Sequence, residues 1–148
     1  MKTQFFIPFL LFINSILFSQ TSNINKENGV ANYGYDVVNY FSGKPQLGSA
    51  NNAVKYQGTN YYFVSPENKA KFQKEPGKYL PQYGGYCAFA MGDYGKKVDV
   101  NPKTFKITDG KLYLFYNKLL TNTLTSWIKD EKNLTIKADK NWQKFNTK

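Results

Sequence analysis

Residues 54–76 read VKYQGTNYYFVSPENKAKFQKEP, and they predict a β-hairpin followed directly by a capped helix. Segments 54–57 and 61–64 alternate apolar and polar side chains on either side of Gly-Thr-Asn. This alternation around a short turn is typical of the two arms of a hairpin, because successive side chains of a strand point to opposite faces. The hairpin is the first structural unit of the expected fold.

A short helix follows this hairpin. Ser65 is a favoured N-cap residue, and Pro66 suits the first helical position, where its missing N–H is not needed. We expect the helix to run to about Glu75, with Ala70 and Phe72 facing inward and lysines facing outward. The proline after Glu75 cannot continue a helix, so the unit ends there.

The remaining pattern predicts a strand, a second hairpin and C-terminal helices. Residues 35–41, YDVVNYF, are β-branched and aromatic, which favours a short strand. Residues 105–116 carry two apolar arms around Asp-Gly, a strong hairpin signal. Residues 120–145 have helical apolar spacing, with a second short helix expected after Asn133. The expected fold is a small single α+β domain with two β-hairpins, a short capped helix between them and C-terminal helices.

One apolar stripe in the C-terminal region is formed by Leu120, Leu124, Trp127 and Ile128. Their spacing places them on one face of a helix, and we expect this face to be buried. Trp127 and Trp142 are both expected to pack in the core.

The N-terminus has the pattern of an export signal. Residues 5–18, FFIPFLLFINSILF, form an apolar run that is too short to span a bilayer comfortably and follows a single lysine. We expect residues 1–20 to be a signal peptide and the polar, Asn-rich residues 21–33 to be a flexible lead-in. The mature protein, with its domain at 34–148, is then exported to the periplasm or secreted, without a stable membrane anchor.

The composition excludes several classes of function. The chain has 148 residues, no histidine and one cysteine, so Ser-His-Asp and Cys-His pairs, an internal disulfide and a Cys-x-x-Cys site are absent. Its 20 basic residues, all lysines, stand against 10 acidic ones and give a net charge of +10. This charge permits attraction to anionic surfaces, but the lack of arginine forks argues against nucleic-acid binding.

Five short motifs are spread along the predicted mature chain. They are GYDVVNYF at 34–41, YYFVS at 61–65, PQYGGYCA at 81–88, DGKLYL at 109–114, and Ala138-Asp139 with Asn141-Trp142. With these motifs the chain resembles the exported branch of the YHS-domain family from residue 34 to about residue 142. The resemblance implies a metal role, because YHS domains are similar to TRASH-type metal-binding modules. Those modules use several Cys or His ligands, so a closed structural zinc site is excluded in this chain.

Copper is the metal that the remaining ligand types favour. Cys87 and Met91 are four residues apart, so both sulfurs would face the same way on a helical turn. Soft thiolate and thioether ligands suit Cu(I), and export places the protein where copper handling is common. We expect Cys87 as the thiolate ligand and Met91 as its thioether partner, with Asp36 and Tyr35 as nearby pocket groups.

Other roles for Cys87 stay open. The thiol can be buried and structural, or it can link two copies in a homodimer. It can also be the nucleophile of a thiol enzyme, with Lys96 or Lys97 as the base. Because no histidine is present to accept the proton, we expect that the protein is not an enzyme.

A pocket for a small organic ligand is the metal-independent alternative. Aromatic side chains gather in sequence around the GYD segment and the GGYC turn, and tyrosine-rich concave surfaces bind small ligands or sugars. The ligand-binding residues expected there are Tyr35, Asp36, Tyr83 and Tyr86.

Overall fold

The computed structural model describes residues 23–146, so the predicted signal peptide (1–20) lies outside the described residues. The elements in chain order are β1 (Lys26–Glu27), β2 (Val30–Ala31), η1 (Asn32–Gly34), η2 (Asn39–Ser42), β3 (Ser49–Tyr56), β4 (Thr59–Phe63), α1 (Pro66–Lys74), α2 (Pro76–Tyr79), η3 (Gln82–Gly85), α3 (Ala88–Asp93), β5 (Asn101–Thr108), β6 (Lys111–Phe115), β7 (Asn117–Lys118), β8 (Thr121–Asn122), α4 (Thr123–Lys129) and α5 (Glu131–Asn146), where η denotes a 3-10 helix. Strands and helices both contribute, which confirms the α+β class. None of the described helices is long and apolar enough to cross a membrane.

The first predicted hairpin is present as strands β3 and β4. They pair antiparallel, and β4 also pairs parallel with β2, which gives the sheet order β1-β2-β4-β3. The turn lies one residue earlier than the sequence indicates, because Gln57 (φ 47°) and Gly58 (φ 74°) occupy it. Two successive positive φ values match the twist of a tight hairpin.

Helix α1 begins where its sequence predicts. The Ser65 hydroxyl oxygen accepts a hydrogen bond from the backbone N–H of Asn68 (3.2 Å), as an N-cap does. Phe72 is fully buried and stacks on Tyr61 with 5.0 Å between ring centroids. Ala70 is exposed, and Asn68 lies inward instead. Asn68 and Phe72 are four residues apart and share one face of the helix, which excludes Ala70 from that face.

Residues 35–41 do not form the predicted strand. Asp36 accepts hydrogen bonds from the backbone N–H groups of Val38 (2.8 Å) and Asn39 (3.2 Å), and the 3-10 helix η2 follows. Such local side-chain bonds to the backbone compete with strand pairing. The segment predicted as a lead-in, 21–33, contains strands β1 and β2 in its described part, and these join the sheet through β4.

The second hairpin and the C-terminal helices are also present. Strands β5 and β6 pair antiparallel around Asp109-Gly110. Helix α5 begins at Glu131, before the predicted start, and is the longest described helix. On the predicted stripe Trp127 is fully buried, but Leu120 and Ile128 are exposed. The stripe therefore breaks, because β8 precedes α4 and takes Leu120 out of helical register.

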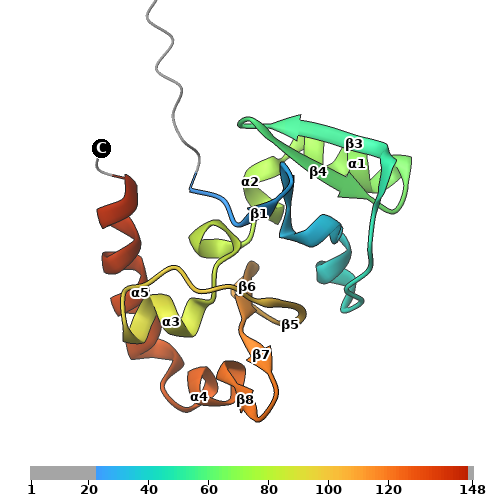
Figure 1. The fold of residues 1–148 in the computed structure, drawn as a ribbon. Coiled ribbons are helices and arrows are strands. Elements are labelled where there is room, and N and C mark those ends of the chain that lie inside the picture. Colours follow the sequence, from blue (N-terminus) through green and yellow to red (C-terminus); the bar gives the residue numbers. More distant parts are fainter. Residues whose placement is uncertain (1–22, 147–148) are drawn as a thin grey trace, which may run out of the picture.

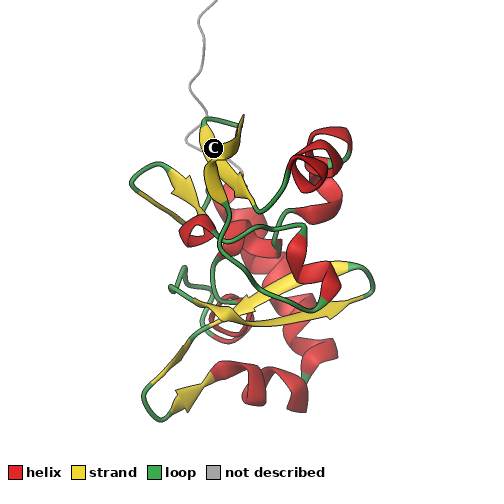
Figure 2. Cartoon of the chain, turned by 90° about the vertical axis from the view of Figure 1, so that its right-hand side faces the viewer, coloured by secondary structure: helices red, strands yellow, loops and turns green. Residues whose placement is uncertain are grey.

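Two groups of elements flank the β5–β6 hairpin (Figure 1). The β3–β4 hairpin with α1 and α2 forms one group, with a core that includes Phe63 and Phe72. Helices α3, α4 and α5 form the other, with a core that includes Trp127 and Met91. Figure 2 shows the β5–β6 hairpin extending across the molecule beside these helices. Its inward side chains, among them Leu112 and Leu114, form a third buried cluster with Cys87.

Candidate functional site

The glycine turn of the PQYGGYCA motif is a left-handed segment. Tyr83, Gly84 and Gly85 have φ values of 54°, 62° and 83° within and around the 3-10 helix η3. A Cβ atom on Gly84 would overlap the backbone carbonyl oxygen of Asn23, so this position requires glycine for space as well as for φ. Asn25 binds both glycines, with its N–H on the Gly84 oxygen (2.8 Å) and its Nδ2 on the Gly85 oxygen (3.2 Å).

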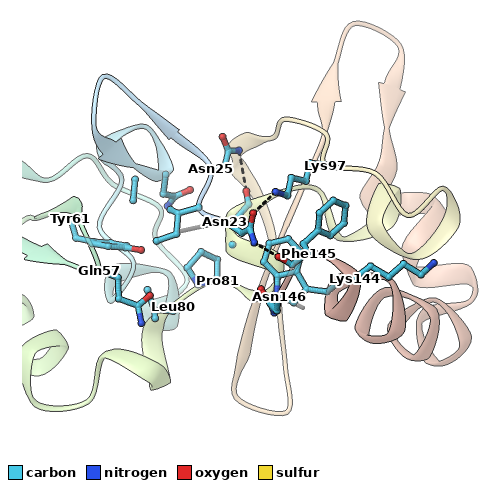
Figure 3. A pocket seen from close by; sticks show the side chains of 16 residues that line it. Asn23, Asn25, Gln57, Tyr61, Leu80, Pro81, Lys97, Lys144, Phe145 and Asn146 are labelled. Carbon is cyan, nitrogen blue, oxygen red and sulfur yellow. Dashed lines mark hydrogen bonds between the residues drawn. The ribbon is translucent and has the colours of Figure 1, made fainter. Parts of the chain in front are cut away.

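This close approach places the start of the described chain inside a cleft of about 770 Å³. Figure 3 shows Gln57, Tyr61 and Leu80 on one side and Lys97, Lys144 and Phe145 on the other. Asn23, Asn25 and Pro81 lie between these walls (Figure 3). The remaining lining residues are Ile24, Ala31, Asn32, Gly84, Gly85, Trp142 and Asn146. The cleft has the size of a small-molecule site.

A partly buried cation stands in one wall. The Nζ atom of Lys97 lies 4.5 Å from the ring centroid of Phe145, 5.6 Å from that of Tyr86 and 5.8 Å from that of Trp142. It also donates a hydrogen bond to Oδ1 of Asn23 (2.6 Å). Burial lowers the pKa of Lys97, while the negative faces of the three rings favour the cation. An ammonium has three donors, so the bond to Asn23 leaves capacity for a ligand.

Asn32 is a buried residue that also lines the cleft. The residue is 2% exposed, and its Nδ2 donates to the Tyr40 hydroxyl oxygen (3.1 Å). Its Oδ1 has no hydrogen-bond partner among the described residues. Buried polar atoms are normally paired, so this oxygen is an unsatisfied acceptor, and a ligand in the cleft could bond to it only if the Asn32 carboxamide turned toward the cleft.

Asp36 does not line the cleft but fastens the GYD segment to the hairpin unit. Besides the N–H groups of Val38 and Asn39, its carboxylate accepts from the Val64 N–H (2.9 Å) and from Nδ2 of Asn68 (2.8 Å). These four bonds match the roughly four acceptor sites of a carboxylate. Asp36 is therefore fully used within the fold.

The predicted pocket tyrosines are separated from one another. Tyr35 makes an isolated bridge with Leu47 and does not line the cleft. Tyr83 is buried, and its hydroxyl donates to Asp139 (2.9 Å) beside a smaller hollow of about 440 Å³. Tyr86 reaches the cleft indirectly, through the contact of its ring with Lys97. The prediction of a pocket beside the GG turn agrees with the cleft, but most of its polar groups come from elsewhere.

Cys87 and Met91 are both fully buried. Sγ of Cys87 lies 3.3 Å from the Thr123 hydroxyl and accepts from the Tyr116 N–H at 3.4 Å. Met91 packs in a different hydrophobic cluster, beside Trp127. Within residues 23–146, no group of three or more His, Cys, Asp and Glu side chains could hold a metal ion. The arrangement does not fit a preformed metal site.

The thiol is free and buried, as one of the alternative interpretations predicts. A disulfide to a second copy requires an accessible sulfur, and this one is covered. The thiol contacts Thr123 and Tyr116, whereas Nζ of Lys97 contacts Asn23 and the rings of the cleft wall. Helix α3, which follows Cys87, is short, with 6 residues. The geometry gives Cys87 a packing role.

The groups that sequence reasoning missed are the carboxamides of the cleft. Asn23 and Asn25 fall in the predicted lead-in, and Asn32 lies just before the GYD motif. Trp142 was expected in the core, but it is half-buried in the cleft wall. Lys97 was considered only as a base for the thiol. No local pattern marks these residues, because the cleft joins segments far apart in the chain.

The comparison with protein families gives one match. The family model of the YHS domain matches residues 38–83, and this confirms, over that segment, the resemblance predicted from the motifs. The match covers η2, the β3–β4 hairpin, α1 and α2, and it ends in the glycine turn. It is consistent with metal binding in general. No curated protein and no solved structure was found to match the chain.

Proposed function

We propose that this protein is an exported, non-enzymatic YHS-domain module that binds a small, polar, neutral or anionic organic ligand in the cleft beside the glycine turn. The observation that carries the proposal is the Lys97 ammonium, which lies against three aromatic rings in the lining of a cleft with no acidic side chain among the described residues. The export signal and the lack of histidine support an extracytoplasmic binding role.

The lining defines the chemistry of the ligand. Carboxamides both donate and accept hydrogen bonds, which suits a ligand rich in hydroxyl groups. The carboxamide residues are Asn23, Asn25, Asn32, Gln57 and Asn146. Aromatic rings of the lining offer flat apolar surface for the faces of a sugar-like ring. No acidic side chain of the described residues lines the cleft, and Lys97 adds a cation, so a carboxylate on the ligand is favoured over an ammonium group.

Glucuronate and glucose are matched probes for this proposal, because they differ by the carboxylate. In NMR titrations we expect glucuronate to shift the indole N–H of Trp142 and the side-chain amides of the cleft more strongly than glucose does. A hydrogen bond to a charged group contributes about 1.5–3 kcal/mol, so Lys97→Gln should weaken glucuronate binding by at least about tenfold. Lys96→Gln is the control, since Lys96 is exposed and outside the cleft.

If neither probe moves the cleft resonances, or if Lys97→Gln and Lys96→Gln bind glucuronate equally, the cleft is not a site for such ligands. Thermal unfolding of both variants shows whether a loss of binding reflects a loss of fold.

Copper binding is a second proposal, and the position of Cys87 and Met91 one helical turn apart favours it. The family match is consistent with a metal role in general, but the matched residues 38–83 do not include these two side chains. A Cu(I) ion would need the Cys87 sulfur to give up its contacts with Tyr116 and Thr123, so binding would require a local opening of the core. Titration of reduced protein with Cu(I) against a competing chelator, on wild type and Cys87→Ser, tests it. If both proteins fail to compete, or compete equally, the copper proposal is rejected.

A further inference from the structure

The tip of the β7–β8 hairpin carries two solvent-exposed leucines. Strands β7 (Asn117–Lys118) and β8 (Thr121–Asn122) pair antiparallel, and Leu119 and Leu120 form the two-residue turn between them. Their side chains are 93% and 104% exposed, the highest values among the exposed large hydrophobic residues of the described chain. Figure 1 shows this hairpin at the lower edge of the molecule, with α4 beside it.

Folding gives no reason for leucine at these two positions. Tight hairpin turns favour Asn-Gly, because the turn needs positive φ. Leu119 instead adopts φ 56°, a conformation that is unfavourable for a side chain of its size. Neither leucine buries apolar surface within the described chain. The hairpin tip therefore combines an unfavourable backbone conformation at Leu119 with two exposed apolar side chains.

The base of the hairpin is held firmly against the domain. Nδ2 of Asn117 donates to the Thr104 hydroxyl (3.0 Å), and Nδ2 of Asn101 donates to the Asn117 carbonyl (3.3 Å). Directly after β8, the N–H and hydroxyl of Thr123 both donate to the Tyr116 carbonyl, at 3.0 Å and 2.9 Å. The leucines thus stand on a fixed projection.

The surroundings of the tip are basic. Lys118 adjoins Leu119, and exposed Lys103 lies between Asn101 and Thr104, the two residues that hold β7. No acidic residue occurs in residues 110–129, and the whole chain has 20 lysines against 10 acidic residues. An apolar tip with a basic base complements a surface that is negatively charged outside and apolar beneath.

We propose that the β7–β8 tip inserts reversibly into anionic lipid surfaces, with Leu119 and Leu120 in the acyl boundary and Lys118 and Lys103 at the headgroups. A protein partner is less suited to the tip, because stable protein interfaces bury about 800 Å² on each side and two leucine side chains offer far less. A lipid surface needs no complementary pocket. Insertion of two side chains is weak and reversible, so it adds no stable anchor.

Vesicle co-sedimentation tests this inference with a variant that spares the fold. Leu119→Asn combined with Leu120→Gly creates the favoured turn sequence, so its unfolding temperature should equal or exceed that of wild type. We expect wild type to bind phosphatidylglycerol-containing vesicles and this variant to bind them at least about tenfold more weakly. Ile136→Asn is the matched control, since Ile136 is also exposed (61%) but lies on α5, and it should bind as wild type does.

Two further measurements test the contribution of charge to vesicle binding and the alternative that the tip mediates self-association. Lys103→Gln with Lys118→Gln should weaken binding to phosphatidylglycerol vesicles, and added salt should do the same, while binding to pure phosphatidylcholine stays low throughout. The proposal is overturned if wild type does not bind phosphatidylglycerol vesicles at low salt, or if the Asn-Gly variant binds them equally. It is also overturned if analytical ultracentrifugation shows a wild-type dimer that the Asn-Gly variant abolishes, because the tip would then pair with a second copy.

Discussion

Replacing Asp36 with alanine should destabilise the fold rather than weaken a binding site. The change removes the acceptor of four hydrogen bonds. It leaves the N–H groups of Val38 and Val64 without this partner, and Nδ2 of Asn68 with only its longer bond to Oδ1 of Asn39 (3.3 Å). Hydrogen bonds to a charged group contribute about 1.5–3 kcal/mol each, and the two bonds between fully buried groups, to Val38 and Asn68, give about 3–6 kcal/mol. Since water can satisfy the outer donors, we expect a loss of about 3–5 kcal/mol, which lowers Tm by roughly 10–20 °C.

Urea unfolding followed by tyrosine and tryptophan fluorescence measures this loss. Asp36→Asn keeps one oxygen but sets an NH₂ group against other donors, so its unfolding free energy should fall between those of wild type and Asp36→Ala. Asp93→Ala is the control, because Asp93 is exposed and should change stability by less than about 0.5 kcal/mol. A loss below about 1 kcal/mol for Asp36→Ala would refute the structural role and return Asp36 to the set of ligand-binding candidates.

Two further predictions concern the glycine turn and the ion pair between Lys106 of β5 and Glu131 of α5. In thermal unfolding, Gly84→Ala should lower the unfolding temperature more than Gly110→Ala does. Both positions have positive φ, but only a Cβ on Gly84 meets the Asn23 carbonyl. Equal decreases in unfolding temperature would contradict the close approach. Burial alone would raise the pKa of Glu131, but the hydrogen bond and 2.6 Å ion pair with Lys106 lower it below its usual range. The stability that Glu131 contributes is therefore present above pH 4.5 and is lost as the pH falls through its lowered pKa. In Glu131→Gln, the free energy of unfolding should accordingly depend less on pH on the acid side. The same pH dependence in wild type and variant would contradict this role.

Local signals made much of the fold predictable. The Ser65 cap and the Asp-Gly of the second hairpin each act within a few residues, so the sequence pattern was sufficient there. The same pattern predicted the β3–β4 hairpin, although its turn lies one residue earlier. The prediction of a strand at residues 35–41 was wrong because distant contacts decide the conformation there. The conformation of this segment depends on Asp36, which is bonded to Val64 and Asn68 about thirty positions further on.

The candidate site was predictable only at the glycine turn. Paired glycines indicated a close backbone approach, and the structure supplies the approaching chain, Asn23 to Asn25. The environment of Lys97 could not be inferred, because its three aromatic neighbours come from the η3–α3 connection and from the end of α5. Sequence spacing carries no information on such contacts. The position of Cys87 in the motif was conspicuous, yet its burial depends on packing among β6, α3 and α4.

The two ends of the described chain meet at the cleft. Nδ2 of Asn23 donates to the Phe145 carbonyl at 2.6 Å, so residues 122 positions apart in sequence are in direct contact. A short linker from residue 146 to residue 23 could therefore close the chain into a ring, and new termini could be opened at an exposed loop such as the one around Gly43. Such a circular permutant would keep the fold and would join the two terminal segments that border the cleft, at Asn23 and at Phe145. By the same geometry, an affinity tag fused directly before residue 23 or after residue 146 would lie beside the cleft and compete with whatever enters it.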